Sequence, residues 1–389
     1  MSERTYINLG VSSEKEGTKE AIKQEYKDEI FKGAFCKIVE DYMGDNDYCS
    51  IMHADGVGSK SILTYLYYKE TGNIELFKGL AQDAMVMNLD DLFCVGAINN
   101  FFISNTIARN LHRISSEILQ QVIVGHKEFI NEMSKYDIHM KSCGGEIEDN
   151  GDLVSVLTEN LTFFTRLKKK DVINCENIKE GNIIVGLSST GKACYETKEY
   201  SGIASNGLTA ARHALLSKCY ADNFPETYSK TIKYDDIYMG KYRLTDKLPY
   251  SDLSVGEALT SPCRVYAPIL KEIIEKYSSD INGIINCTGK GQTKCKGFGQ
   301  NLHYIKDNLF ETPPLFRAIK ESNNLLEKEL FQIFNMGHMI ELYCNPNIAN
   351  NIIEISKKYN VDAKVVGKVE KSYDANKVTI KYEDKEFIY

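Results

Sequence analysis

The alternation of short apolar segments with longer amphipathic ones is the feature that most constrains this chain. Apolar residues at three- and four-residue steps predict helices, and short β-branched runs between turn residues predict strands. Strands are predicted at 48–54, 182–187, 283–287 and 339–344, and helices at 75–95, 117–136, 207–220, 264–277 and 348–359. Strands that alternate with helices indicate layered α/β or α+β packing and exclude all-α and all-β folds.

The length of the chain and one polar segment predict two domains. At roughly 100 to 200 residues per domain, 389 residues are enough for two or three domains. The lysine-rich stretch 166–181 is the best boundary, which gives an N-terminal domain at 1–168 and a C-terminal domain at 169–389. Segment 223–253 is expected to be a long irregular insertion, and 371–389 either a hairpin or a loose tail.

Charge and composition argue against several classes of protein. The net charge of −7 argues against nucleic-acid binding, because proteins of that class carry a basic surface. Aspartates interrupt the most apolar region, 76–103, so no stretch of about 20 apolar residues is expected to cross a membrane. The 11 cysteines are scattered without a C-x-x-C pair, which predicts reduced thiols rather than disulfides or zinc. With a polar N-terminus, these features predict a cytoplasmic protein.

A predicted strand that ends at Asp55 and is followed by Gly56, Gly58 and Lys60 is a candidate phosphate site. The glycines let the backbone approach a ligand closely, and Lys60 adds a positive charge. Asp55 at the strand end is a candidate magnesium ligand. Asp-Gly is also a common turn pair, so this segment alone fits a plain glycine turn equally well.

Three aspartates lie within the most apolar predicted helix. Asp83 and Asp90 are two helical turns apart and share a face, and Asp91 lies about a quarter turn further round. Ionised carboxylates on such an apolar helix are costly unless they are paired or bind a metal, and few cations are near in the sequence. The alternative interpretation is the exposed stripe of a core helix.

A third acidic group follows the predicted strand at 138–142. Gly144 and Gly145 precede Glu146, Asp149 and Asp152, a pattern that an acidic loop also explains. Magnesium prefers hard oxygen ligands and often bridges carboxylates to nucleotide phosphates. The three acidic groups together therefore predict a magnesium–nucleotide site.

Two other patterns indicate little chemistry. Segment 186–193 follows a strand and nearly matches the phosphate-binding loop G-x-x-x-x-G-K-[ST], but Ala193 stands where the magnesium-binding hydroxyl belongs. His53 and His213 have no serine or cysteine partner in a readable motif, so structural roles are expected for both.

Eight segments, in this order, resemble the aminoimidazole ribonucleotide synthetase family, also called phosphoribosylformylglycinamidine cyclo-ligases. They are 6–11 (similar to Y-x-x-x-G-V-D), 55–60 (D-G-V-G-T-K), 83–97 (D…N-D-L-x-x-x-G-A), 144–149 (G-G-E-T-A-E), 205–208 (S-N-G-x-S-L), 261–266 (A-P-T-R-I-Y), 286–289 (L-T-G-G) and 334–337 (F-N-x-G). The chain departs from the family patterns at Ser12, Asp90, Ala204, Lys290 and His338, and by an insertion before Ala204.

The resemblance implies a two-domain α/β protein whose N-terminal sheet pairs with that of a second copy in a homodimer. It implies ATP and Mg2+ as cofactors and formylglycinamidine ribonucleotide as the small-molecule substrate. The γ-phosphoryl group of ATP would pass to the formyl amide oxygen, the amidine nitrogen would close the imidazole ring, and phosphate would leave.

The resemblance and the acidic motifs assign a role to each candidate residue. Expected are Asp55, Asp91, Glu146 and Asp149 as magnesium ligands; Lys60 and Asp91 as catalytic residues; Gly56, Gly58, Lys60 and Asp83 at the ATP phosphates; and Ser205, Asn206, Gly207, Thr288, Gly289 and Asn335 at the substrate. Residues 205–207 open a predicted helix, and a helix N-terminus is a natural phosphate site.

Two other functions are kept beside this one. A small-molecule kinase of the same superfamily would keep the fold and change the phosphoryl acceptor. A non-catalytic nucleotide-binding paralogue would have lost its chemistry in the altered loops, although the retained carboxylates argue against it.

Overall fold

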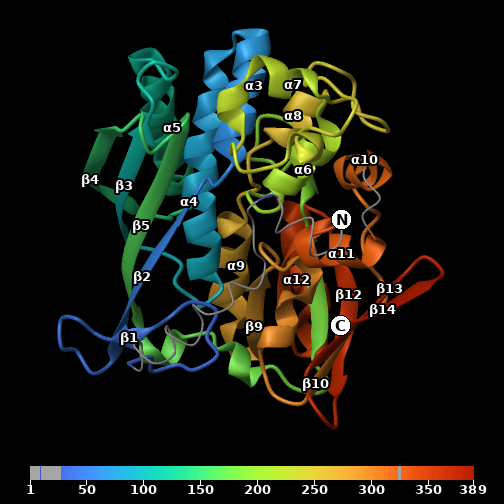
Figure 1. The fold of residues 1–389 in the computed structure, drawn as a ribbon. Helices are drawn as coiled ribbons and strands as arrows, with labels where there is room; N and C mark the ends of the chain where they lie inside the picture. The colour runs from blue at the N-terminus through green and yellow to red at the C-terminus, as the bar shows by residue number, and fades with distance from the viewer. Residues whose placement is uncertain (1–8, 10–27, 323–325) are drawn as a thin grey trace.

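The computed structural model describes Leu9, residues 28–322 and residues 326–389. It is a mixed α/β fold with two large sheets (Figure 1), so the predicted fold class is confirmed. Apart from Leu9, the first resemblance motif at 6–11 lies outside the described residues, and so does Ser12.

The first sheet is built entirely from residues before 169. Its five strands lie in the order β1 (Val39–Glu40), β2 (Tyr48–Gly56), β5 (Leu157–Lys168), β3 (Phe101–Arg109) and β4 (Met140–Asp149). All pairs are antiparallel except β3 with β4. Helices α4 (Lys78–Phe93) and α5 (Ser116–Ser134) pack on one face, and no described element covers Met52 and Phe102 on the other (Figure 1).

Strand β4 extends further than the sequence predicted. The expected strand ended at residue 142, before the glycines, but β4 continues through Gly144, Gly145 and Glu146 to Asp149. A Cβ at Gly145 would meet Asn105 Oδ1 at 1.9 Å, so the glycine serves the close parallel pairing with β3 rather than a turn. From Lys141 to Asp149 this edge strand is exposed.

The second sheet is built from residues after 182. Its seven strands lie in the order β14 (Lys385–Ile388), β13 (Lys377–Tyr382), β10 (Leu302–Lys306), β12 (Ala363–Lys371), β6 (Ile183–Ser188), β11 (His338–Cys344) and β9 (Ile281–Asn286). Strands β13 and β14 pair as an antiparallel hairpin, so the hairpin alternative for 371–389 is correct.

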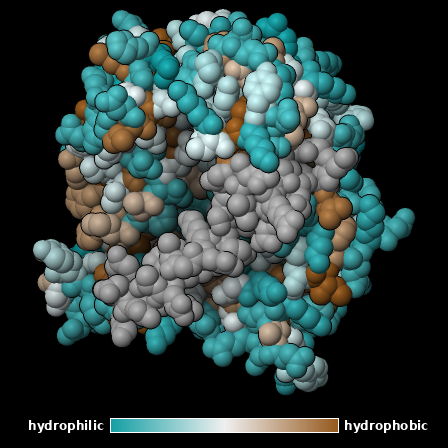
Figure 2. Space-filling view, viewed as in Figure 1, coloured by the Kyte–Doolittle hydropathy of each residue, from teal (hydrophilic) through white to brown (hydrophobic). Residues whose placement is uncertain are grey.

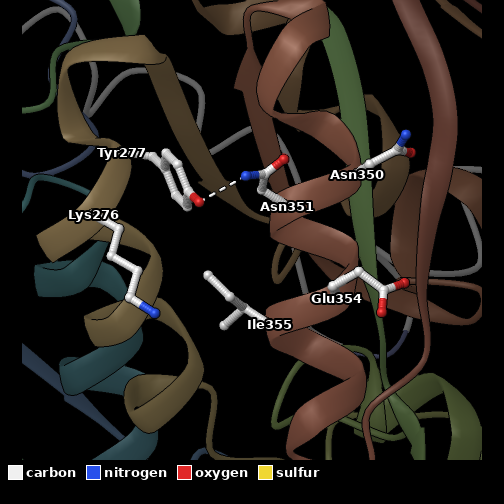
Figure 3. A pocket seen from close by; sticks show the side chains of 6 residues that line it. All are labelled: Lys276, Tyr277, Asn350, Asn351, Glu354 and Ile355. Atoms are coloured by element: carbon white, nitrogen blue, oxygen red, sulfur yellow. Dashed lines mark hydrogen bonds between the residues drawn. The ribbon is translucent and has the colours of Figure 1, made fainter.

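Helices α9 (Ala267–Tyr277) and α12 (Ala349–Lys358) lie side by side on the second sheet, and α9 also contacts α4. A small pocket opens between α9 and α12 (Figure 3), where Asn351 donates a hydrogen bond to the Tyr277 hydroxyl at 2.7 Å. Its lining is Lys276, Tyr277, Asn350, Asn351, Glu354 and Ile355, which includes none of the predicted site residues.

The remaining helices are α3 (Lys60–Thr71), α6 (Leu208–Leu215), α7 (Cys219–Asn223), α8 (Val255–Leu259), α10 (Pro314–Ser322) and α11 (Glu327–Ile333). The single helix predicted at 207–220 is wrong, because α6 ends at Leu215 and α7 begins at Cys219. Between them, Leu216 and Ser217 form backbone bridges with Tyr242 and Gly240. This pairing with a distant segment interrupts the helical hydrogen bonds.

Segment 223–253 is irregular, as predicted, but it is packed against the rest of the molecule. Ile237, Tyr238, Leu244 and Leu248 are buried. The backbone amide of Tyr238 donates to His213 Nδ1 at 3.1 Å. This buried hydrogen bond ties the segment to α6.

The two sheets share a continuous hydrophobic core. Met85 and Leu89 of α4 belong to the same apolar cluster as Ile269 of α9 and Ile340 of β11. The division into domains at 1–168 and 169–389 therefore stays a prediction. None of the described helices has both the length and the apolar character to span a membrane. All 11 cysteines lie in the described residues and are free thiols.

We predict that His213 makes the fold less stable in acid. Burial and, to a smaller extent, the charge of Arg212 together lower the pKa of its ring to about 3, while the unfolded ring titrates near 6.5. The contribution of the neutral His213 ring to the free energy of unfolding is fully present above pH 6.5. It falls by about 1.4 kcal/mol per pH unit toward pH 3, because the unfolded chain binds the proton and the folded chain does not.

Urea unfolding between pH 7.5 and pH 5 measures this slope. His213→Asn keeps an acceptor for the Tyr238 amide and is expected to flatten the slope by about one proton. The exposed His112→Asn should keep the wild-type slope. Equal slopes in the wild type and His213→Asn would contradict the assignment.

Candidate active site

Asp55 and Asp91 are linked at the junction of β2 and α4. Asp55 is the penultimate residue of β2, and Asp91 lies in the last turn of α4. His53 shares the strand face of Asp55 and places its Nε2 3.3 Å from Asp91 Oδ2. Asn88, one turn before Asp91, donates from Nδ2 to the Asp55 carbonyl at 3.1 Å, and its Oδ1 lies 2.9 Å from His53 Nδ1. His53 and Asn88 therefore hold the two acidic residues in one arrangement.

The negative charges of Asp55 and Asp91 repel each other. Burial raises the pKa of Asp55 and the charge of Asp91 adds to this, against a hydrogen bond from the Gly56 amide to Asp55 Oδ1 at 2.7 Å. For His53, burial lowers the pKa, but the pairing with Asp91 outweighs it and the net pKa is raised. Two repelling carboxylates are stabilised by a cation, and carboxylate oxygens are the ligands that magnesium prefers. The donor set fits a magnesium–nucleotide complex.

Asp91 also contacts the second sheet. Asn286, the last residue of β9, donates from Nδ2 to Asp91 Oδ1 at 2.9 Å. Thr288 and Gly289, the predicted substrate residues, follow directly after this contact. The structure thus brings one predicted substrate loop next to a predicted metal ligand.

Lys60 and Asp83 form a fully buried ion pair. Lys60 Nζ lies 2.7 Å from Asp83 Oδ1, and the exposed fractions of the two side chains are 0% and 1%. The same oxygen accepts the Cys263 backbone amide at 2.7 Å, whereas Asp83 Oδ2 has no partner among the described residues. Both residues were predicted to bind ATP phosphates, and here each faces the other rather than solvent.

The glycine turn lies against the N-terminus of α6. Gly56 closes β2, and Gly58 begins the turn that leads into α3. Ser59 Oγ of this turn lies 3.0 Å from Thr209 Oγ1 in the first turn of α6. Segment 55–60 and segment 205–207, two separate motifs in the sequence, therefore lie together.

The predicted substrate residues converge from three loops. Gly207 has φ of +77°, and a Cβ there would lie 2.5 Å from the Phe334 ring, so only glycine fits. A Cβ on Gly289 would lie 3.7 Å from Asn206 Oδ1. Asn335 is buried, and its side-chain amide forms hydrogen bonds with two other loops. Its Oδ1 accepts from Ser189 Oγ at 2.9 Å, and its Nδ2 donates to the Gly202 carbonyl at 2.8 Å. Asn335 thus orders the loops around the site.

Glu146 and Asp149 lie apart from the other predicted metal ligands. Asp55 on β2 pairs with Leu161 on β5, which pairs with Asn105 on β3, which pairs with Gly145 on β4. Three strand spacings separate Asp55 from Glu146 by about 14 Å. Asp149 accepts a hydrogen bond from Arg109 Nε at 2.6 Å. A single chain does not gather all four carboxylates.

Asp90 explains one departure from the family pattern. Burial raises its pKa well above the usual range, and the charge of Asp91 raises it further. A protonated carboxylic acid offers one donor and one acceptor, as the amide of the family asparagine does. The sequence alone does not reveal this, because it does not show that the Asp90 side chain is fully buried.

Sequence reasoning missed Asn88 and Asn286, and it treated His53 as structural. The available signal was position: Asn88 lies one turn before Asp91, and Asn286 opens the resemblance motif at 286–289. The weak match to a phosphate loop at 186–193 is not followed by a helix but by the short pair β7 (Thr190–Gly191) and β8 (Tyr200–Ser201). The carbonyls of Ser188 and Thr190 accept from Arg264, so this loop presents acceptors to a cation.

Sequence comparison identifies relatives of one kind. Residues 35–162 match the family described as AIR synthase related protein, N-terminal domain. The chain is 30% identical over 348 residues to a phosphoribosylformylglycinamidine cyclo-ligase of Methanocaldococcus jannaschii, covering 88% of this chain and 86% of that protein. It is 28% identical over 399 residues to one from Methanococcus maripaludis, covering 99% of both.

Solved structures share the fold at low identity. AaThiL complexed with AMPPCP and TMP matches with a TM-score of 0.56 at 10% identity, over 96% of both chains. T. maritima PurL complexed with FGAR matches with a TM-score of 0.53 at 13% identity, over 91% of this chain. This chain spans about half of that PurL chain, 47% of its length. At these identities the likeness concerns the fold alone.

We predict that Asp83→Ala destabilises the protein by about 3–5 kcal/mol, because it leaves the Lys60 charge buried without a partner. The double variant Lys60→Met, Asp83→Leu should lose much less, since apolar side chains of similar size replace a buried ion pair at little cost. Urea unfolding measures both. Lys135→Met, which breaks an exposed pair with Glu132, is the control and should stay near the wild type. Asp83→Ala with wild-type stability would refute the structural role of the pair.

Proposed function

The chain belongs to the phosphoribosylformylglycinamidine cyclo-ligase family, and on that premise we propose that it converts formylglycinamidine ribonucleotide to aminoimidazole ribonucleotide in purine biosynthesis. The observation that carries the proposal is the link between Asp55 and Asp91 beside the loop that holds Thr288 and Gly289. We propose ATP and magnesium as the cofactors. The free cysteines fit a reducing cytoplasm, where we place the reaction.

The chemistry requires a leaving group on the formyl amide carbon. Bound magnesium–ATP would supply the phosphoryl group that turns the amide oxygen into that leaving group. Asp55 and Asp91 would hold the metal, and His53 and Asn88 would keep the two carboxylates in position. The protein contributes positioning and charge neutralisation, which are the main effects in phosphoryl transfer.

The loops would position the ribonucleotide. Ser205, Asn206 and Gly207 precede α6, whose backbone amides suit a phosphate group. Thr288 and Gly289 would contact the substrate close to Asp91, and Asn335 would hold the surrounding loops in place. In this arrangement the Gly56–Gly58 backbone approaches the nucleotide phosphates, and Lys60 adds its charge from beneath, paired with Asp83.

The proposal includes a homodimer that completes the site. The uncovered sheet face carries the exposed Met52 and Phe102, and on the left of Figure 2 apolar residues gather where Figure 1 draws this sheet. Strand β4 is an exposed edge, and β1 pairs only with Ser50 and Cys49 of β2 among the described residues. An unpaired strand edge is a template for pairing with another chain. We propose that β4 of one copy pairs with β2 of the other, which brings the partner's Glu146 to Asp55.

Activity is tested with formylglycinamidine ribonucleotide, ATP and magnesium, with ADP and aminoimidazole ribonucleotide measured together. We predict that both products form in equal amounts and that Asp91→Asn lowers the rate by about a thousandfold, because it removes a metal-binding charge. The amide still accepts from Asn286, so the fold should be unchanged by circular dichroism. Asp374→Asn, at an exposed position, is the matched control and should keep wild-type activity.

Each other outcome has a defined meaning. ADP without aminoimidazole ribonucleotide would indicate a kinase with a different acceptor. ATP binding without turnover would favour the non-catalytic paralogue. Wild-type turnover by Asp91→Asn would refute the metal role of Asp91.

Mixing two inactive variants tests the shared site. If Asp91 of one chain works with the partner's Glu146, a heterodimer of Asp91→Asn and Glu146→Gln contains one intact site of its two. We predict that each variant alone is inactive and that an equimolar mixture, after subunit exchange, regains about a quarter of the wild-type activity. A mixture that stays inactive despite exchange, seen by light scattering and tagged pull-down, would place both residues in one chain, whereas activity of Glu146→Gln alone would exclude Glu146.

A further inference from the structure

Lys294 is a partly buried cation that has no acidic partner among the described residues. It lies in the short 3-10 helix Gly291–Gly297, directly after the loop of Thr288 and Gly289. Its Nζ donates to Thr288 Oγ1 at 3.2 Å and lies 4.5 Å from the centre of the Phe35 ring. Within residues 28–322 and 326–389, no carboxylate oxygen lies within 4.0 Å of this ammonium group. Among the described residues, the Lys294 ammonium group thus contacts a neutral hydroxyl and an aromatic ring.

Most other buried cations of the described residues have a carboxylate partner, with Arg212 as an exception that donates to the Thr227 carbonyl. Lys60 pairs with Asp83, Lys306 with Glu341 and Arg264 with Glu196, and all six side chains are buried. Removing a charge from water without a counter-charge is costly, so these pairings are the expected arrangement. Lys294 departs from it at the edge of the candidate site, where a bound anion would supply the missing charge.

The lysine is held in a defined place. The Phe35 ring stacks on Phe298 with centroids 5.7 Å apart and planes at 15°, so the surface beneath the ammonium group is fixed. Because Thr288 Oγ1 holds the other side of Nζ, little side-chain entropy is left to lose when an anion binds. This preorganisation is typical of a binding group rather than of a free surface lysine.

Lys294 faces the same space as the acidic residues. Asn286 contacts Asp91, and Thr288 follows two residues later, a span of about 7 Å in extended chain. The positive charge of Lys294 is one of the influences that oppose the rise in the pKa of Asp55. The ammonium group therefore lies near Asp55 and Asp91, on the side of the candidate site that follows β9.

We propose that Lys294 binds a phosphate oxyanion at the candidate site, next to the Thr288–Gly289 loop. The inference rests on the proposed function for the source of that phosphate, which is either the nucleotide or the 5′-phosphate of the ribonucleotide. A lysine ammonium group is a compact point charge with three donors, which suits non-bridging phosphate oxygens. The contacts with Thr288 and Phe35 leave Nζ with donors to spare.

Binding of two probes, magnesium–ADP and ribose 5-phosphate, is measured by calorimetry for the wild type and three variants. Lys294→Met keeps the length and apolar stem of the side chain and should weaken one probe by about 10- to 100-fold, as expected for a lost charged hydrogen bond. Lys294→Arg keeps the charge and should bind within about threefold of the wild type. Lys296→Met changes an exposed lysine of the same short helix and should bind like the wild type.

The affected probe identifies the source of the phosphate. Weaker magnesium–ADP binding assigns Lys294 to the nucleotide, and weaker ribose 5-phosphate binding assigns it to the ribonucleotide. Equal affinities in Lys294→Met and the wild type, or no binding of either probe by the wild type, would overturn the proposal. If Lys294→Met does not fold, Lys294→Gln takes its place.

These readouts separate the site from the reaction. A wild type that binds a probe through Lys294 but forms no aminoimidazole ribonucleotide would refute the proposed function and keep the phosphate site. A wild type that is active while Lys294→Met binds both probes normally would refute the site and keep the function.

Discussion

The ion pair of Lys60 with Asp83 is the interaction on which the candidate site depends. It joins the first residue of α3 to the middle of α4, and Asp83 also accepts the amide of Cys263 from the segment before α9. Three parts of the chain that are distant in sequence thus meet at one carboxylate. Because neither charge is stable alone in the interior, the glycine turn, α4 and the approach to α9 are held together as a unit.

Helix α4 shows how environment gives three aspartates different states. Asp83 forms an ion pair, Asp90 is fully buried with a raised pKa, and Asp91 is partly exposed beside His53 and Asn286. Charge partners and burial, rather than residue type, decide which carboxylate is available to a ligand. Of the three aspartates on this helix, only Asp91 contacts His53 and Asn286 at the candidate site.

Both sheets contribute residues to the candidate site. Asp55 and Asp91 come from the first sheet and its helix, whereas Asn286, Thr288 and Lys294 follow the edge strand β9 of the second. The continuous apolar cluster around α4 and α9 fixes how these two groups face each other. The carboxylates of Asp55 and Asp91 thus come from the first sheet and its helix, and Lys294, which has no acidic partner among the described residues, comes from the second. This arrangement of charges suits a ligand that carries both a metal ion and a phosphate group.

The sequence by itself determined the fold class and the positions of α4, α5, α9 and α12 and of β2, β6, β9 and β11, and it predicted Asp55 and Asp91 as metal ligands. These features depend on local periodicity, turn residues and the cost of carboxylates in an apolar helix, and each of them can be recognised within a short segment of sequence.

Tertiary structure decided the rest. The continuation of β4 through Gly145 depends on the approach of β3, and the end of α6 depends on pairing with residues 240–242. The separation of Glu146 from Asp55 follows from strand order, and the isolation of Lys294 follows from which carboxylates fold beside it. No local pattern encodes these contacts, because each is made between segments that meet only when the whole chain is packed.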